Sequence, residues 1–137
     1  MKQQVRHNLE TMANFYVIET NVRILHGQMF RCSALTSREM ESVHDACKSA
    51  LGDDCDRRTA IRAEIFAMLY FCQPEAIFRQ VGVNRTVAMY VTKIMGLSRP
   101  NYSRYKRSLL FLYYHDKQFQ TMADKAIDAV NELVGEK

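Results

Sequence analysis

Basic side chains gather in one part of this sequence, between residues 76 and 115. That window holds seven of the 19 Lys and Arg residues and none of the 15 Asp and Glu residues. The rest of the chain therefore has three more acidic than basic residues, although the whole chain carries a net charge of +4. A group of cations from which acids are excluded attracts a polyanion such as the phosphate backbone of a nucleic acid.

The densest part of this window starts at Gly96 and reads Gly-Leu-Ser-Arg-Pro-Asn-Tyr-Ser-Arg-Tyr-Lys-Arg. Glycine is typical of a tight turn, and Ser98 is typical of a residue that caps a helix N-terminus. Pro100 fits the first turn of a helix, where its missing N–H group costs nothing. We therefore expect a helix from Arg99 to about Tyr114 that presents its basic side chains early.

A second helix is expected just before this turn, over residues 85–95. Asn84 can cap its start, and Gly96 ends it. Val87 and Val91 are four residues apart and belong to its buried face, together with Ile94 or Met95.

The remaining elements that position these residues are also expected to be helices. Apolar residues at three-and-four spacing predict an amphipathic helix over residues 2–30. Thr36 and Glu39 have the spacing of a capping box, and Gly52 ends the helix that they begin. A further helix is expected over residues 60–71, with the polar break of Asp53, Asp54 and Asp56 able to cap it and Pro74 able to stop it. Others are expected over residues 74–80 and after a cap at Asp116.

The composition favours one all-α domain. The chain has 137 residues, 47% of them hydrophobic, with only five Gly and two Pro. This length suits one core, and few turn formers predict long helices with short connections. We expect a six- to seven-helix bundle, in which residues 1–52 pack or dimerise, residues 56–115 hold the turn and its helices, and residues 116–137 form a C-terminal helix. Phe111 to Tyr114 are apolar on every side, which predicts a central helix or an interface.

The segment from about residue 86 to 109 resembles the helix-turn-helix family of DNA-binding proteins. The resemblance rests on Gly96 at the turn, the cap at Ser98 and apolar residues on both sides of the turn. These apolar residues are Val91, Met95, Leu97, Tyr102 and Tyr105. Thr92 departs from the pattern because the family usually has a smaller residue, often Ala, four positions before the turn glycine.

The resemblance implies that the helix from Arg99 enters the major groove of double-stranded DNA and that the preceding helix crosses the backbone. Base edges would be reached by Arg99, Asn101, Ser103 and Arg104. Phosphates would be bound by Arg85, Lys93, Ser98, Lys106 and Arg107.

The function implied is that of a transcriptional regulator or a mobile-element accessory factor. Such proteins often dimerise, and the first or last helix is then expected at a homodimer interface. The alternative is a helical interaction module whose basic face binds an acidic protein. Ion pairs between Arg99, Arg104 or Arg107 and the chain's own acids would favour that alternative.

An enzyme is not expected, and no catalytic residue, metal ligand set or cofactor is assigned. His44 and Cys47 have the spacing of a base and a thiol nucleophile on one helix, but Cys47 falls on the apolar stripe and is expected in the core. Glu39, Glu41 and Asp45 surround His44 without a closed ligand set, which favours a solvated face. Phosphate-loop and dinucleotide-binding glycine motifs are absent, and no small-molecule ligand is evident.

Cysteine use and hydropathy bear on the compartment. The four cysteines lack a C-x-x-C pair, so we expect reduced thiols, with disulfides as the alternative that the even count permits. The N-terminus lacks the apolar run of a signal peptide, and no segment approaches the ~18 apolar residues of a membrane span. A soluble cytoplasmic protein without membrane contact is expected.

Overall fold

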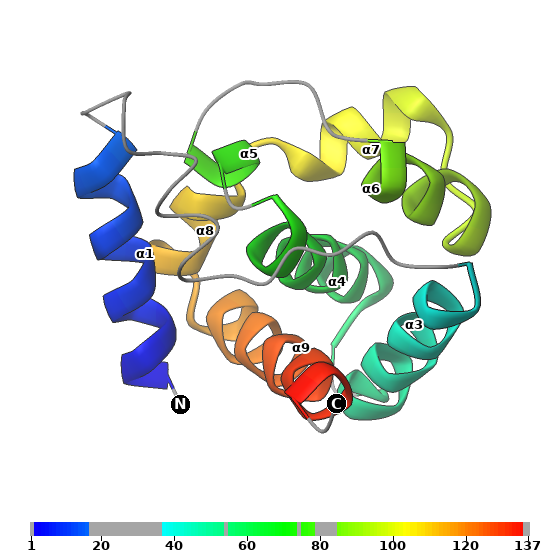
Figure 1. The fold of residues 1–137 in the computed structure, drawn as a ribbon, viewed down its shortest axis with the longest axis horizontal. Coiled ribbons are helices and arrows are strands. Elements are labelled where there is room, and N and C mark those ends of the chain that lie inside the picture. The colour runs from blue at the N-terminus through cyan, green and yellow to red at the C-terminus, as the bar shows by residue number, and fades with distance from the viewer. Residues whose placement is uncertain (1, 17–36, 54, 74, 79–84, 136–137) are drawn as a thin grey trace.

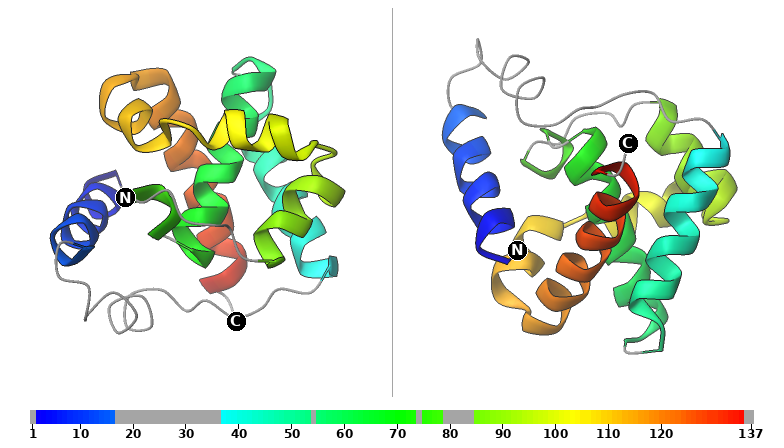
Figure 2. Two further views of the ribbon diagram at one scale, coloured as in Figure 1. Left: turned by 90° about the horizontal axis from the view of Figure 1, so that it is seen from above. Right: turned by 60° about the horizontal axis from the view of Figure 1, so that its bottom comes forward.

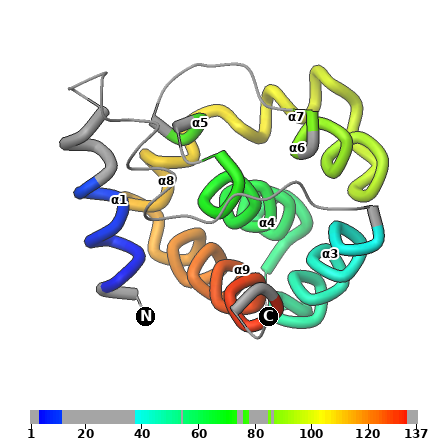
Figure 3. The backbone as a smooth tube through the Cα atoms, in the orientation of Figure 1, coloured from blue at the N-terminus to red at the C-terminus, as the bar shows by residue number. Residues whose placement is uncertain are grey.

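The computed structural model describes residues 2–16, 37–53, 55–73, 75–78 and 85–135, and the regular structure within these ranges is helical throughout. Figure 1 shows the arrangement of the helices, and Figure 3 traces the path of the chain through them. The all-α class expected from the sequence is thereby confirmed for the described residues. The elements are α1 (Lys2–Tyr16), α3 (Ser37–Leu51), α4 (Arg57–Cys72), α5 (Glu75–Phe78), α6 (Arg85–Met89), the π-helix η2 (Tyr90–Ile94), α7 (Arg99–Lys106), α8 (Leu109–His115) and α9 (Lys117–Gly135).

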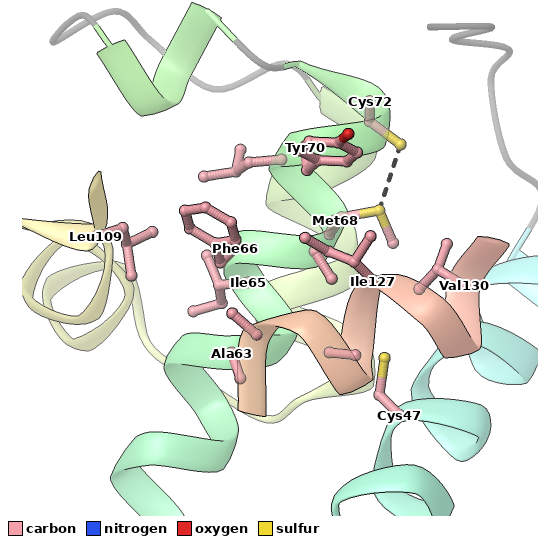
Figure 4. Close-up of a cluster of buried hydrophobic side chains, with 14 of the residues drawn as sticks. Cys47, Ala63, Ile65, Phe66, Met68, Tyr70, Cys72, Leu109, Ile127 and Val130 are labelled. Carbon is pink, nitrogen blue, oxygen red and sulfur yellow. Dashed lines mark hydrogen bonds between the residues drawn. The ribbon is translucent and has the colours of Figure 1, made fainter. Parts of the chain in front are cut away.

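Helix α4 is the centre of the molecule (Figures 1 and 2). Residues 63–70 are all buried, on every side of the helix, and α3, α7 and α9 pack against it. Figure 4 shows the apolar side chains that it contributes to the core, among them Ile65, Phe66 and Met68. The central helix is therefore α4 and not the segment from Phe111 to Tyr114, because the side chain of Phe111 is 62% exposed.

The ends of α4 are set by local hydrogen bonds. The Oδ1 atom of Asp56 accepts the backbone N–H of Thr59 at 2.7 Å, so Asp56 is the N-cap among the three aspartates that the sequence offers. At the other end the N–H of Gln73 donates to the carbonyl of Leu69 at 2.9 Å. The expected stop residue, Pro74, lies outside the described residues.

Helices α3 and α9 cover one side of α4. The apolar stripe expected on α3 is buried, and the helix ends at Gly52, which adopts the left-handed backbone conformation with φ +53°. The N–H of Gly52 donates to the carbonyl of Lys48, which closes the last turn. Thr36, expected to cap this helix, lies outside the described residues.

Helix α9 begins as the sequence predicts. The Oδ1 atom of Asp116 accepts the N–H of Phe119 at 3.1 Å, and the apolar stripe from Phe119 through Val130 is buried. Asp124 is buried on the same helix and accepts the hydroxyl proton of Tyr113 from α8 at 2.7 Å.

Helix α1 lies at the edge of the bundle. Val5 and Leu9 are buried, and the Nδ2 group of Asn8 donates to the hydroxyl oxygen of Tyr70 at 2.7 Å. The part of the expected first helix that comes after Tyr16 lies outside the described residues.

The helix expected from Arg99 to Tyr114 is two helices, which corrects the sequence prediction. Ser108 separates α7 from α8 and has φ +65° and ψ +23°, a left-handed conformation that L residues rarely adopt. The interruption carries no local signal, because residues 101–114 contain neither Gly nor Pro. Arg107 consequently lies in the connection and not on a helix.

Among the helices that the structure describes, none combines the length and the apolar character needed to cross a membrane. Cys47, Cys55 and Cys72 form no disulfide, and Cys32 lies outside the described residues.

Candidate nucleic-acid interface

The turn before α7 depends on the backbone conformation of Gly96. Its φ of +67° is in the left-handed region, and a Cβ atom added there would meet nothing within 4 Å. The glycine is therefore required by its dihedral angle and not by crowding. The N–H groups on either side of it donate back into the preceding helix, from Met95 to Tyr90 and from Leu97 to Val91, both at 3.1 Å.

The start of α7 agrees with the sequence prediction. Ser98 is the N-cap, and its Oγ atom accepts the backbone N–H of Asn101 at 3.3 Å. Pro100 lies in the first turn. Leu97, the residue before the cap, is buried and ties the turn to the core. The turn and the helix start are thus held by one left-handed glycine, one serine cap and one apolar anchor.

Helix α7 has a buried side and an exposed side. Tyr102 is buried, and Tyr105 is half-buried with the guanidinium of Arg62 lying 5.5 Å from its ring centroid. With 3.6 residues per turn, Ser103 and Arg104 lie on the opposite side of the helix, and both are exposed. The tyrosines therefore face the protein, as expected from the sequence.

Most residues assigned to DNA contact are accessible to solvent. Lys106 is the exception, since it is half-buried and burial lowers the pKa of its ammonium group. The exposed residues are Arg85, Lys93, Ser98, Arg99, Asn101, Ser103, Arg104 and Arg107.

Three arginines of this segment, Arg99, Arg104 and Arg107, are free of acidic partners in the part of the chain that the structure describes. Their positive charges thus face solvent, which is the arrangement that a polyanion requires.

Lys93 lies apart from α7, in a different electrostatic environment. It lines an open cleft between α3 and η2, together with Glu41, His44, Asp45 and Ile94. Glu41 and Asp45 place two negative charges in the same cleft, which lowers the positive potential around Lys93. Lys93 is therefore less suited to a phosphate contact than Arg99 or Arg104.

The helix expected over residues 85–95 changes its hydrogen-bond pattern midway. It is α-helical as α6 and becomes the π-helix η2 at Tyr90. Thr92, the residue that departs from the family pattern, donates its hydroxyl proton to the carbonyl of Ala88 at 2.8 Å. Its polar group is thus satisfied within its own helix.

A buried polar network that is not predicted from the sequence lies beside this segment. Glu64 of α4 is 4% exposed, and its Oε2 atom accepts hydrogen bonds from the Tyr90 hydroxyl and from Nδ1 of His44, the latter at 2.7 Å. The one available signal is an acidic residue within the apolar run Ala-Glu-Ile-Phe-Ala-Met-Leu. An ionisable residue in such a run is rarely buried unless it has partners.

Burial raises the pKa of the Glu64 carboxyl group, and the hydrogen bonds from Tyr90 and His44 oppose this increase. Burial, and to a lesser degree the nearby charge of Glu64, also raises the pKa of the Cys47 thiol. A thiol held in its protonated form is a poor nucleophile. The buried, protonated thiol of Cys47 therefore gives no support to a Cys47–His44 nucleophilic site.

In the described ranges, no group of three or more His, Cys, Asp or Glu side chains could hold a metal ion. No protein-family model matches the chain, and neither the curated proteins nor the solved structures include a significant match.

Proposed function

We propose that this protein binds double-stranded DNA through α7 and the turn that precedes it, in the manner of a helix-turn-helix protein. The observation that carries the proposal is the two-sided character of α7. Tyr102 and Tyr105 face the protein, while Arg99 and Arg104 are exposed and form no ion pair in the described part of the chain.

The helix start adds to the attraction for a polyanion. Backbone N–H groups and the helix dipole favour negative charge at an N-terminus, and Ser98, Arg99 and Asn101 are exposed there. We assign Asn101 and Arg104 to base edges, because an amide suits adenine and a guanidinium suits guanine. We assign Arg107, in the α7–α8 connection, to a phosphate. A role in transcription or in a mobile element is the biological setting proposed for this binding, and the proposal includes a homodimer.

The salt dependence of binding tests this function. The affinity of the wild-type protein for a fluorescently labelled duplex should fall linearly on a plot of log affinity against log salt. The double variant Arg104→Ala/Arg107→Ala should lower the magnitude of that slope by about one, because Arg107 is the proposed phosphate contact of the pair and Arg104 the proposed base contact. Fluorescence anisotropy at several salt concentrations measures both slopes.

The matched control removes two exposed cations from elsewhere on the surface, Lys48 on α3 and Lys117 on α9. Lys48→Ala/Lys117→Ala makes the same change in net charge and should leave the slope unaltered. Equal slopes for wild type and Arg104→Ala/Arg107→Ala, with both proteins folded, would exclude this interface. Competition by an acidic polypeptide as strong as that by the duplex would instead favour the acidic-protein partner.

A further inference from the structure

Tyr90 is the point at which two features of the structure meet. Its side chain donates to buried Glu64, and its backbone carbonyl accepts the N–H of Met95, five residues later, at 3.1 Å. That second bond is π-helical, whereas an α-helix would pair Tyr90 with the N–H of residue 94. The hydroxyl of Tyr90 is thus fixed at the position where the extra residue enters the helix.

The π-helix alters the position of the turn and of α7, which come after it in the chain. Compared with an α-helix, one inserted residue shifts the later part of the chain by about 1.5 Å and about 100° around the axis. Tyr90 and Val91 are buried within η2, and Leu97 is buried after it. Gly96 and the start of α7 therefore occupy their positions only while the extra residue is retained.

The π-helix is the less favourable form, so contacts outside it must retain it. The Tyr90–Glu64 hydrogen bond is suited to this because it joins η2 to the central helix α4 across 26 residues of sequence. His44 adds a third element, α3, to the same carboxylate oxygen, and its ring lies edge-on to that of Tyr90 with centroids 6.4 Å apart.

We propose that Glu64 and Tyr90 are positioning residues, which hold the π-helical turn and thereby set how α7 sits against α4. The consequence for DNA rests on the proposed function of α7. The positioning itself is a property of the free protein. Loss of the Tyr90 hydroxyl would release η2 towards regular α-helix and reorient α7, so that binding to a preferred DNA sequence weakens more than non-specific binding does.

The test uses Tyr90→Phe, which removes one oxygen atom and keeps the buried ring. The matched control is Tyr113→Phe, because Tyr113 also donates from a buried ring to a carboxylate that is 4% exposed, that of Asp124. Amide hydrogen exchange, measured by NMR without DNA, should become about tenfold faster at Met95 and Leu97 in Tyr90→Phe, as expected for the loss of one net hydrogen bond. These two amides should be unchanged in Tyr113→Phe.

Residual dipolar couplings report the orientation of α7 relative to α4 in the same samples. The orientation should change in Tyr90→Phe and stay constant in Tyr113→Phe. Glu64→Gln is the conservative second variant, since its amide oxygen can still accept the Tyr90 proton, and it should retain the wild-type orientation. It also keeps the proposal falsifiable if Tyr90→Phe does not fold.

Wild-type exchange rates at Met95 and Leu97 together with an unchanged α7 orientation in Tyr90→Phe would overturn the inference. DNA binding is measured separately, as the ratio of affinities for an enriched and a random duplex, and this ratio should fall in Tyr90→Phe. A wild-type protein with no salt-dependent DNA affinity would refute the proposed function, whereas the exchange and coupling data would still decide whether Tyr90 positions α7.

Discussion

Two tyrosine–carboxylate contacts of this protein share their chemistry but differ in the elements that they connect. Tyr90 donates to Glu64 and Tyr113 donates to Asp124, and all four side chains are buried. The first contact joins η2 to α4 across 26 residues and includes His44 of α3. The second joins α8 to α9, and its two residues are 11 apart along the chain.

The difference shows that the effect of a buried hydrogen bond on the fold depends on which elements it connects as well as on its strength. Helices α8 and α9 are held together by their short connection, and the ring of Tyr113 also stacks on Phe66 at 5.2 Å between centroids. Helix η2 has no such connection to α4. The Tyr90–Glu64 contact therefore constrains the arrangement of distant elements, whereas the Tyr113–Asp124 contact reinforces an arrangement that the chain already favours.

The largest effect is expected when each carboxylate is removed. Glu64→Ala should lower the free energy of unfolding by about 3 kcal/mol, because it leaves a cavity and deprives both Tyr90 and His44 of their acceptor. Asp124→Ala should cost about 2 kcal/mol, since the shorter side chain leaves a smaller cavity while the Tyr113 hydroxyl loses its acceptor. Urea denaturation followed by circular dichroism measures both. If Asp124→Ala lowers the free energy of unfolding as much as Glu64→Ala or more, the Tyr90–Glu64 contact is not the more important of the two.

A smaller effect is expected from the pH dependence of Glu64. Burial raises its pKa above the ordinary 4.5, so the folded state binds this proton more tightly than the unfolded state does. The resulting stabilisation is complete below pH 4.5 and is lost as the pH rises through the higher pKa of the folded state. Glu64→Gln lacks this loss, so its stability relative to wild type should increase as the pH rises above about 4.5. Urea titrations across that range measure the difference, and a constant or decreasing difference would contradict the expectation.

The smallest effect concerns Ser108, which lies on the chain between Tyr90 and Tyr113. Ser108→Gly should stabilise the protein by about 0.5–1 kcal/mol, because glycine adopts φ +65° without the cost that a side chain brings. Ser103→Gly, in the exposed middle of α7, should instead destabilise it. Thermal unfolding compares the two variants.

The same substitution sharpens the comparison when it is added to Tyr90→Phe and to Tyr113→Phe. If the two contacts are energetically independent of the junction, the gain from Ser108→Gly should be equal in both backgrounds within about 0.5 kcal/mol. Unequal gains would show that Ser108 couples the α7 side of the molecule to the α8 side.

Local features are predictable from the sequence because their causes are local. The caps at Asp56, Ser98 and Asp116 and the glycine at the turn each depend on a few neighbouring residues, and the structure confirms them. The inward orientation of Tyr102 is expected from the family resemblance, and Tyr102 is buried in the structure.

Features that depend on distant contacts are not predictable in this way. The apolar segment that contains Phe111 is expected either in the centre or at an interface. The central position belongs to α4, because its neighbours cover every side of it. The break at Ser108 and the π-helix at Tyr90 have no sequence signal of their own. The network around Glu64 requires three elements to meet, so its partners cannot be chosen from the sequence alone.

The open space beside the two left-handed glycines has a consequence for how this chain tolerates mutation. An added Cβ atom at Gly52 or Gly96 would have no other group within 4 Å. Whether a substitution is tolerated at these positions therefore depends on how readily the new residue adopts a positive φ. Asparagine enters the left-handed region more readily than other residues with a Cβ atom, and β-branched residues enter it least. A library of substitutions at these two positions should therefore rank by dihedral preference, with side-chain size and hydrophobicity contributing little.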